Sequence, residues 1–166
     1  SKSVIISSAI MSLTSKNKQF TNSYYAPTPR QTANLARRLA KNWHGGEIIA
    51  LSGELGAGKT FFTQAVAKYL GVTTPVTSPT FVICEHYPCK HPTIKELVHI
   101  DTYRLNSSND LINLGFSDFA GQPGYLTIIE WPEKIATLLP ANTWYIHLDH
   151  QPPGRLITWQ NPTAHK

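Results

Sequence analysis

The chain has 166 residues, of which 41% are hydrophobic and 15% are charged, with a formal net charge of +5 and a pI near 9.3. This balance excludes a disordered chain and fits one globular domain, and no apolar run reaches the ~18 residues of a membrane span. Cys84 and Cys89 are too few for a disulfide framework, so we expect a reducing, cytoplasmic location, and the basic balance suits an anionic partner.

Strands and helices alternate in the first half of the predicted domain. Residues 1–16 are expected to be a flexible extension or a cloning remnant, and residues 17–166 the domain itself. A weak strand is expected over 18–25. Apolar residues at helical spacing predict a helix over 32–42, with Thr28 or Thr32 as its cap. The apolar run 47–52 predicts a buried strand, and 60–70 predicts a helix that stops at Gly71.

The second half contains shorter, mostly β-type segments. Strands are expected over 80–85 and 97–103, and a short helix over 109–119 that breaks at Gly115. The segment 125–131 (YLTIIEW) predicts a second buried strand, and 144–148 and 155–159 predict an antiparallel hairpin across Gly154. The pattern indicates a single α/β domain in which helices flank a mixed, partly parallel sheet.

The segment Gly53–Thr60 reads GELGAGKT and matches the phosphate-loop pattern in full. Its glycines allow backbone N–H groups to converge on phosphates, and the following helix adds its positive end. Lys59 supplies a charge to the β- and γ-phosphates, and the Thr60 hydroxyl is a magnesium ligand. The sequence therefore predicts a P-loop NTPase-like domain that uses ATP and Mg²⁺. The guanine-reading Asn-Lys-x-Asp is absent from the chain, which favours ATP.

Two carboxylates end apolar stretches and are candidates for the chemistry of hydrolysis. Glu130 closes the run LTIIE, the position from which an acidic residue supports magnesium. Asp101 follows Leu97–Ile100 and is a candidate for orienting the attacking water or holding a magnesium-bound water. The alternative for Glu130 is a solvated carboxylate at a strand end. The alternative for Asp101 is a turn residue that makes local backbone hydrogen bonds.

Four landmarks in order resemble those of the TsaE family, the bacterial ATPase of tRNA threonylcarbamoyladenosine biosynthesis. They are SGELGAGKT at 52–60, VTSPTF at 76–81, HIDTYRL at 99–105 and IEWPEK at 129–134. The resemblance covers roughly residues 20–160. The last three are more specific than the phosphate loop, because unrelated ATPases lack them.

The resemblance implies a role for individual residues. Catalysis would rest on Asp101, Lys59 and Glu130, with Thr60 and Glu130 holding the metal. The residues expected to bind ATP are Thr32, Glu54, Leu55, Gly56, Ala57, Gly58, Lys59, Thr60, Phe61, Thr80, Trp131 and Arg155. Phe61 stands where the family usually has a second Thr or Ser, so its backbone N–H would take over the phosphate contact. Thr102 replaces a more usual apolar residue, a change expected to matter little.

The implied function is an ATP-hydrolysing subunit that acts with the TsaD and TsaB proteins in modifying tRNA. Its nucleotide cycle would reset the complex, and tRNA would be reached indirectly, through the complex. A P-loop small-molecule kinase is the alternative enzyme, and a nucleotide-gated binding module the non-enzymatic one. Cys84, His86, Cys89 and His91 are closely enough spaced to raise a zinc site, but an incidental cluster between strands is preferred. Arg37, Arg38 and Lys41 form a basic helical face, either solvated or contacting tRNA or a partner.

Overall fold

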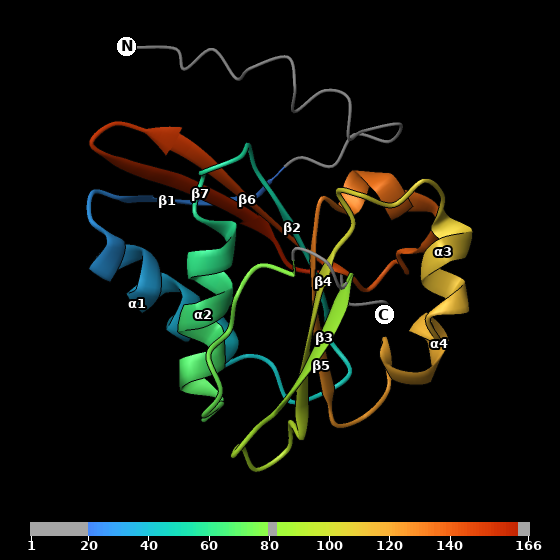
Figure 1. Ribbon diagram of the computed structural model, residues 1–166. Coiled ribbons are helices and arrows are strands. Elements are labelled where there is room, and N and C mark those ends of the chain that lie inside the picture. The colour runs from blue at the N-terminus through green and yellow to red at the C-terminus, as the bar shows by residue number, and fades with distance from the viewer. Residues whose placement is uncertain (1–19, 80–82, 163–166) are drawn as a thin grey trace.

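The computed structural model describes residues 20–79 and 83–162, which form one seven-stranded sheet with helices on both faces (Figure 1). The strands are β1 (Asn22–Ala26), β2 (Ile48–Ser52), β3 (Cys84–Pro88), β4 (Glu96–Asp101), β5 (Tyr125–Glu130), β6 (Trp144–Gln151) and β7 (Gly154–Gln160). The helices are α1 (Pro29–Ala40), α2 (Lys59–Tyr69), α3 (Ser108–Asn113), α4 (Phe116–Phe119) and the 3₁₀ segment η2 (Pro132–Leu138). The extension expected over residues 1–16 lies outside the described residues.

The centre of the sheet is parallel and its edges are antiparallel. The strand order is β1-β7-β6-β2-β5-β4-β3. Strand β2 pairs in parallel with both β5 and β6, and β4 pairs in parallel with β5. Every residue of β2 is buried, as its unbroken apolar sequence requires of a strand covered on both faces. The prediction of an α/β domain with a mixed, partly parallel sheet is confirmed.

Alternation along the central strands divides the interior into two cores. Leu97 and Ile128 face α1 and α2, where Phe62 is fully buried. Val98 and Ile129, their neighbours along the same strands, instead face the side of α3, α4 and η2. The molecule therefore has three layers, with helices above and below one twisted sheet.

The structure corrects some predicted boundaries. Helix α1 begins at Pro29, three residues earlier than expected, because the Thr28 hydroxyl caps it by accepting from the backbone N–H of Gln31 at 3.4 Å. The break at Gly115 is confirmed, since this residue has a φ of 79° between α3 and α4. The terminal hairpin is also confirmed, although its turn precedes Gly154, which is already the first residue of β7.

We expect Gly154→Ala to destabilise the fold by about 1–3 kcal/mol or more, because overpacked positions force the backbone to shift. A Cβ at Gly154 would overlap the carbonyl oxygen of Ala26 and lie 2.6 Å from the Cα of Pro27, both of them backbone atoms. The measurement is the free energy of unfolding in urea. Gly121→Ala is the comparison variant, because its methyl group would meet only a methyl group of Ile48 at 4.0 Å within the described residues, and its cost therefore comes from the positive φ of 79° alone, about 1–2 kcal/mol. An unchanged midpoint for Gly154→Ala would contradict the close approach of β7 to the end of β1.

Candidate nucleotide-binding site

The phosphate loop connects the central strand β2 to the start of α2. Three of its glycines have positive φ, 147° at Gly53, 80° at Gly56 and 105° at Gly58. A Cβ at Gly53 would lie 2.5 Å from the carbonyl oxygen of Leu148 on β6, so this position requires glycine for space as well as for conformation. The loop thus curls back over the end of the sheet at the carboxyl ends of its parallel strands, where α/β folds bind ligands.

Lys59 lies inside this loop rather than in solvent. Its side chain is 5% exposed, and its Nζ donates to the carbonyl oxygens of Gly53 at 2.5 Å and Glu54 at 3.0 Å. The ammonium also lies 4.4 Å from the centre of the Trp131 ring, a cation–π contact. Burial lowers the pKa of Lys59 from its ordinary 10.5, and the carboxylates of Glu130 and Asp101 oppose that shift. A further anionic group at the ammonium, such as a phosphate, would stabilise its charge more.

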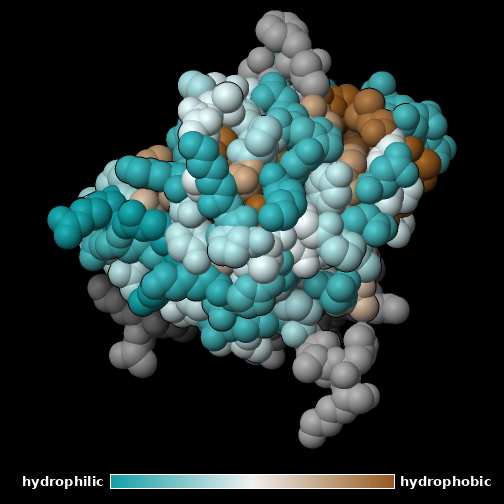
Figure 2. Space-filling model, turned by 90° about the horizontal axis from the view of Figure 1, so that it is seen from below, coloured by the Kyte–Doolittle hydropathy of each residue, from teal (hydrophilic) through white to brown (hydrophobic). Residues whose placement is uncertain are grey.

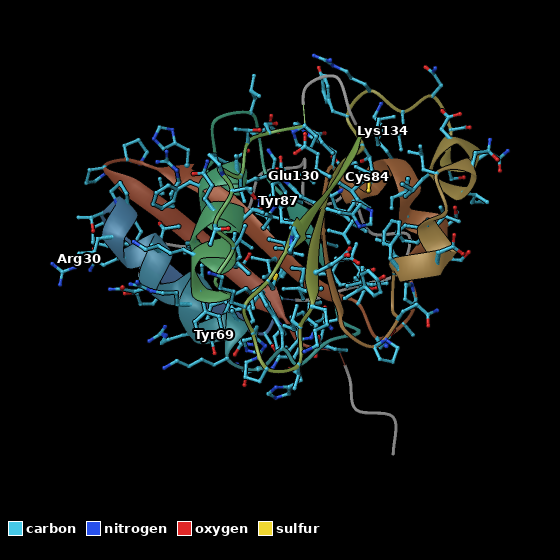
Figure 3. The ribbon with its side chains drawn as sticks, turned by 60° about the horizontal axis from the view of Figure 1, so that its bottom comes forward. Arg30, Tyr69, Cys84, Tyr87, Glu130 and Lys134 are labelled. Carbon is cyan, nitrogen blue, oxygen red and sulfur yellow. The ribbon has the colours of Figure 1, made fainter. Side chains whose placement is uncertain are left out.

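Glu130, at the end of β5, is the centre of a buried polar cluster. Its side chain is 3% exposed, and Figure 3 shows it in the interior, among side chains of the sheet. Its Oε1 accepts from the hydroxyl of Thr60 at 3.3 Å and lies 2.9 Å from Nε2 of the fully buried His99. The structure therefore brings together the two residues expected to hold magnesium. The alternative of a solvated carboxylate does not describe Glu130.

Asp101 ends β4 directly beside Glu130, with which it pairs in the parallel register. Residues paired in this way point to the same face of the sheet, so the two carboxylates lie on the face that carries the phosphate loop. One oxygen of Asp101 accepts from the backbone N–H of Tyr103 at 2.9 Å, the local turn contact considered as its alternative role. This bond uses one acceptor site and leaves the rest of the carboxylate for other partners.

Thr102 has a structural role that the sequence did not predict. Its side chain is fully buried, and its hydroxyl lies 2.9 Å from the carbonyl oxygen of Glu130 and 2.5 Å from that of Trp131. Trp131 has a φ of 57°, the one positive value at a residue other than glycine in residues 20–79 and 83–162. The hydroxyl thus holds the turn at which the chain leaves β5, where Glu130 and Trp131 are positioned. An apolar residue at position 102 would lose this contact.

A pocket of about 330 Å³ lies beside the loop, between the start of α1 and the start of β7. Five of the residues expected to bind ATP line it, namely Thr32, Ala57, Gly58, Phe61 and Arg155. Arg155 donates from Nε to the carbonyl oxygen of Ala57 at 2.8 Å, which ties β7 to the loop. Phe61 is 39% exposed, so its ring is a wall of the pocket while its backbone belongs to the first turn of α2. This is a suitable place for the base and sugar of a nucleotide.

The other residues that were predicted to bind ATP, and that have not been placed above, lie away from this pocket or outside the residues that the structure describes. Glu54, Leu55 and Gly56 form the exposed tip of the loop, and Leu55 is 91% exposed. Thr80 lies outside the described residues, so its predicted place near the γ-phosphate stays a prediction.

The site contains two histidines that were not among the functional residues predicted from the sequence. His99 reaches Glu130 because β4 and β5 are neighbours in the sheet, although 31 residues separate the two in sequence. The sequence contained one signal for this role, because His99 lies two residues before Asp101 in a strand and residues at that spacing share a face of the sheet. His147 on β6 lies 2.8 Å through Nδ1 from the hydroxyl of Ser52, at the entrance of the loop. Burial lowers the pKa of His147, which favours the neutral ring.

The closely spaced cysteines and histidines do not form a metal centre in the described chain. No group of three or more potential ligands comes together in residues 20–79 and 83–162. Instead His86 pairs with Glu96 at 2.8 Å, and Cys84 lies 3.7 Å from the His86 ring.

We expect both thiols to react slowly, because burial raises the pKa of Cys84 and of Cys89 to about 11. The thiolate is the nucleophile, so alkylation by iodoacetamide should accelerate about tenfold per pH unit well past pH 9 and level off near 11. The single variants Cys84→Ser and Cys89→Ser each keep one thiol, so they assign the alkylation rate of that thiol. Glutathione is the reference for a fully exposed thiol. Circular dichroism confirms that the protein stays folded at each pH. A plateau near pH 9 would show that the thiols are accessible to water.

A parallel central strand, a glycine loop and a helix that starts with Lys-Thr define a P-loop NTPase-like α/β fold. The family model for "Threonylcarbamoyl adenosine biosynthesis protein TsaE" matches residues 26–157, so the chain belongs to the TsaE family, which is involved in tRNA threonylcarbamoyladenosine biosynthesis. The expected family is therefore confirmed. In the part of the chain that the structure describes, no helix has the length and apolar character to cross a membrane.

Individual relatives agree with the family match. A TsaE protein of Rickettsia bellii is 40% identical over 112 residues, which are 67% of this chain and 74% of that protein. A TsaE protein of Mycobacterium bovis is 32% identical over 139 residues, 80% of this chain and 83% of that protein. The crystal structure of YdiB from Bacillus subtilus matches with a TM-score of 0.72 at 27% identity, and the match covers 88% of this chain and 89% of that one.

Proposed function

We propose that this protein binds ATP with magnesium and hydrolyses it, and that it does so as a subunit acting with TsaD and TsaB in tRNA threonylcarbamoylation. The observation that carries this proposal is the cluster at the carboxyl ends of β2, β4 and β5. There the Lys59 ammonium, the Thr60 hydroxyl and the Glu130 carboxylate lie within one buried site. Such an arrangement supports phosphoryl transfer more specifically than a glycine loop alone.

The oxygen donors at this site fit a magnesium ion. Thr60 and Glu130 supply a hydroxyl and a carboxylate that are 3.3 Å apart, and hard oxygen ligands are those that Mg²⁺ prefers. When bound, the metal would neutralise charge on the phosphates. His99, held 2.9 Å from Glu130, keeps the carboxylate oriented toward α2, because a buried side chain with two partners has little freedom to rotate.

Other residues of the site bind the phosphates, the attacking water and the base. The backbone N–H groups of the loop and the start of α2 receive the phosphates, and Lys59 places a positive charge where negative charge grows in the transition state. Asp101, partly buried beside Glu130, orients the attacking water in line with the γ-phosphate. The pocket around Phe61 and Arg155 takes the base and sugar.

The test is phosphate release from labelled ATP by the full-length chain, alone and mixed with purified TsaD and TsaB, while tRNA modification is measured in parallel. We expect turnover to water that depends on Mg²⁺ and falls strongly in Asp101→Ala, which removes the group that orients water. The absence of turnover with all partners present would overturn the proposal. Transfer of the phosphate to an organic acceptor would support the kinase alternative instead. Full activity of Asp101→Ala would overturn the role of that carboxylate.

A further inference from the structure

Positive charge is concentrated on one side of the molecule. The first acidic residue of the chain is Glu47, and residues 55–84 contain no Asp or Glu. Helices α1 and α2 therefore carry basic side chains but no carboxylate. The acidic residues near the other end of the sheet include Asp110 and Asp118 on α3 and α4. In the view from below, the side that carries α1 is mostly hydrophilic, and hydrophobic atoms gather on the opposite side, where α3 and α4 lie (Figure 2).

A groove of about 430 Å³ opens on this basic side. Helix α1 lines it with Asn34, Arg37 and Arg38, and Lys41 follows directly after that helix. Tyr24 of β1 and Tyr69 at the end of α2 complete the lining described here. We call it the basic groove. The Arg38 guanidinium lies 5.3 Å from the centre of the Tyr24 ring, and Arg37 donates to the Asn34 side chain. No carboxylate lies within ion-pair distance of these three cations in residues 20–79 and 83–162.

The basic groove is separate from the nucleotide pocket. That pocket uses the first turn of α1, including Thr28 and Thr32, whereas the cations of the groove follow at the other end of the helix. At a rise of 1.5 Å per residue, Arg37 and Lys41 lie about 8 and 14 Å along the axis from Thr32, and no residue that the structure describes lines both cavities. In Figure 3, Arg30 projects from one end of α1, and Tyr69 of the groove lies toward the other end. A ligand in the groove therefore leaves the nucleotide pocket free.

We propose that the basic groove binds RNA, with its cations on backbone phosphates. Cations near the end of a helix also interact favourably with its dipole, but that effect requires neither an open groove nor flanking aromatic rings. A positively charged groove follows the backbone of a nucleic acid. The rings of Tyr24 and Tyr69 are partly buried and lie beside Arg38 and His91, so they form the walls of the groove. An acidic peptide would use the same charges, and the experiment below distinguishes it from RNA. The choice of RNA rests on the family's part in tRNA modification and is independent of ATP hydrolysis. It replaces the expectation that tRNA is reached only indirectly, through the complex.

The experiment compares two variants of the full-length chain that have the same net charge. Arg37→Ala/Arg38→Ala/Lys41→Ala removes the cations of the groove, and Arg30→Ala/Lys95→Ala/Lys134→Ala removes three exposed cations that do not line it. Alanine preserves helix propensity in α1. Binding of fluorescein-labelled tRNA is followed by anisotropy at several salt concentrations, without ATP. The melting temperature and ATP binding of each variant are measured alongside.

We expect the groove variant to bind tRNA at least about tenfold more weakly than the wild type, and its salt dependence to decrease by a slope of about 2, since each lost phosphate contact contributes about 0.7. The control should keep most of the affinity. Equal losses in both variants would overturn the inference by showing that only net charge matters. Competition by polyglutamate as strong as that by unlabelled RNA would also overturn it, in favour of an acidic protein partner. Retained ATP binding with lost tRNA binding supports this inference, and absent ATP binding in the wild type would contradict only the proposed function.

Discussion

Replacing Lys59 by methionine should lower the rate of ATP hydrolysis by about 10²–10³-fold, the usual effect of removing one preorganised group that stabilises transition-state charge. The ammonium is already fixed by two loop carbonyls and the Trp131 ring, so it needs little rearrangement to meet a phosphate. Methionine keeps most of the length and the apolar contact of the lysine stem, while the positive charge is lost. The measurement is the steady-state rate of phosphate release with and without the partner subunits.

The same substitution should leave the fold intact. Burial lowers the pKa of Lys59, which means that the folded state disfavours its charged form. Removing that charge relieves a cost at neutral pH, which offsets the loss of the two hydrogen bonds to the loop carbonyls, and we expect the melting temperature to stay within a few degrees of the wild type. Lys68→Met is the matched control, because Lys68 lies exposed on the same helix and should keep full activity. A wild-type rate for Lys59→Met, or an equal loss in the control, would contradict the assignment.

The sequence predicted best those parts of the structure that depend on residues close together in the sequence. The buried strands predicted over 47–52 and 125–131 became β2 and β5, because a strand covered on both faces needs mostly apolar residues. The phosphate loop could be placed because its glycines, lysine and threonine follow one another in eight residues. The break at Gly115 was also local, since glycine readily takes the positive φ found there.

The contacts that complete the site depend instead on which strands become neighbours. His99 meets Glu130 only because β4 and β5 pair in parallel, and Arg155 meets Ala57 across 98 positions because β7 folds back along the sheet. Thr102 seemed neutral as a substitution, yet its hydroxyl holds the turn at Trp131. Composition and periodicity carry no information about these pairings, so the contacts become visible only once the register is known.

Glu130→Gln should raise the Mg²⁺ concentration required for half-maximal ATP hydrolysis and lower the maximal rate by about 10²-fold, in line with the loss of one well-placed electrostatic group. Glutamine has the same shape and retains an oxygen for Thr60, but it brings no negative charge to a hard cation. The measurement is a magnesium titration of the hydrolysis rate, repeated with nucleotide binding by calorimetry. Glu133→Gln removes the same charge from an exposed residue three positions away and serves as the control.

A second variant separates the metal role of Glu130 from its structural one. Glu130→Ala leaves the fully buried His99 without its partner at Nε2, and a buried polar group without a partner costs about 1–3 kcal/mol. We therefore expect Glu130→Ala to lose both stability and magnesium affinity, whereas Glu130→Gln loses mainly magnesium affinity. If the magnesium titration of Glu130→Gln matched that of the wild type, Glu130 would be a structural partner of His99 and Thr60, and the metal would depend on Thr60 together with another carboxylate, for which Asp101 is the nearest neighbour in the sheet.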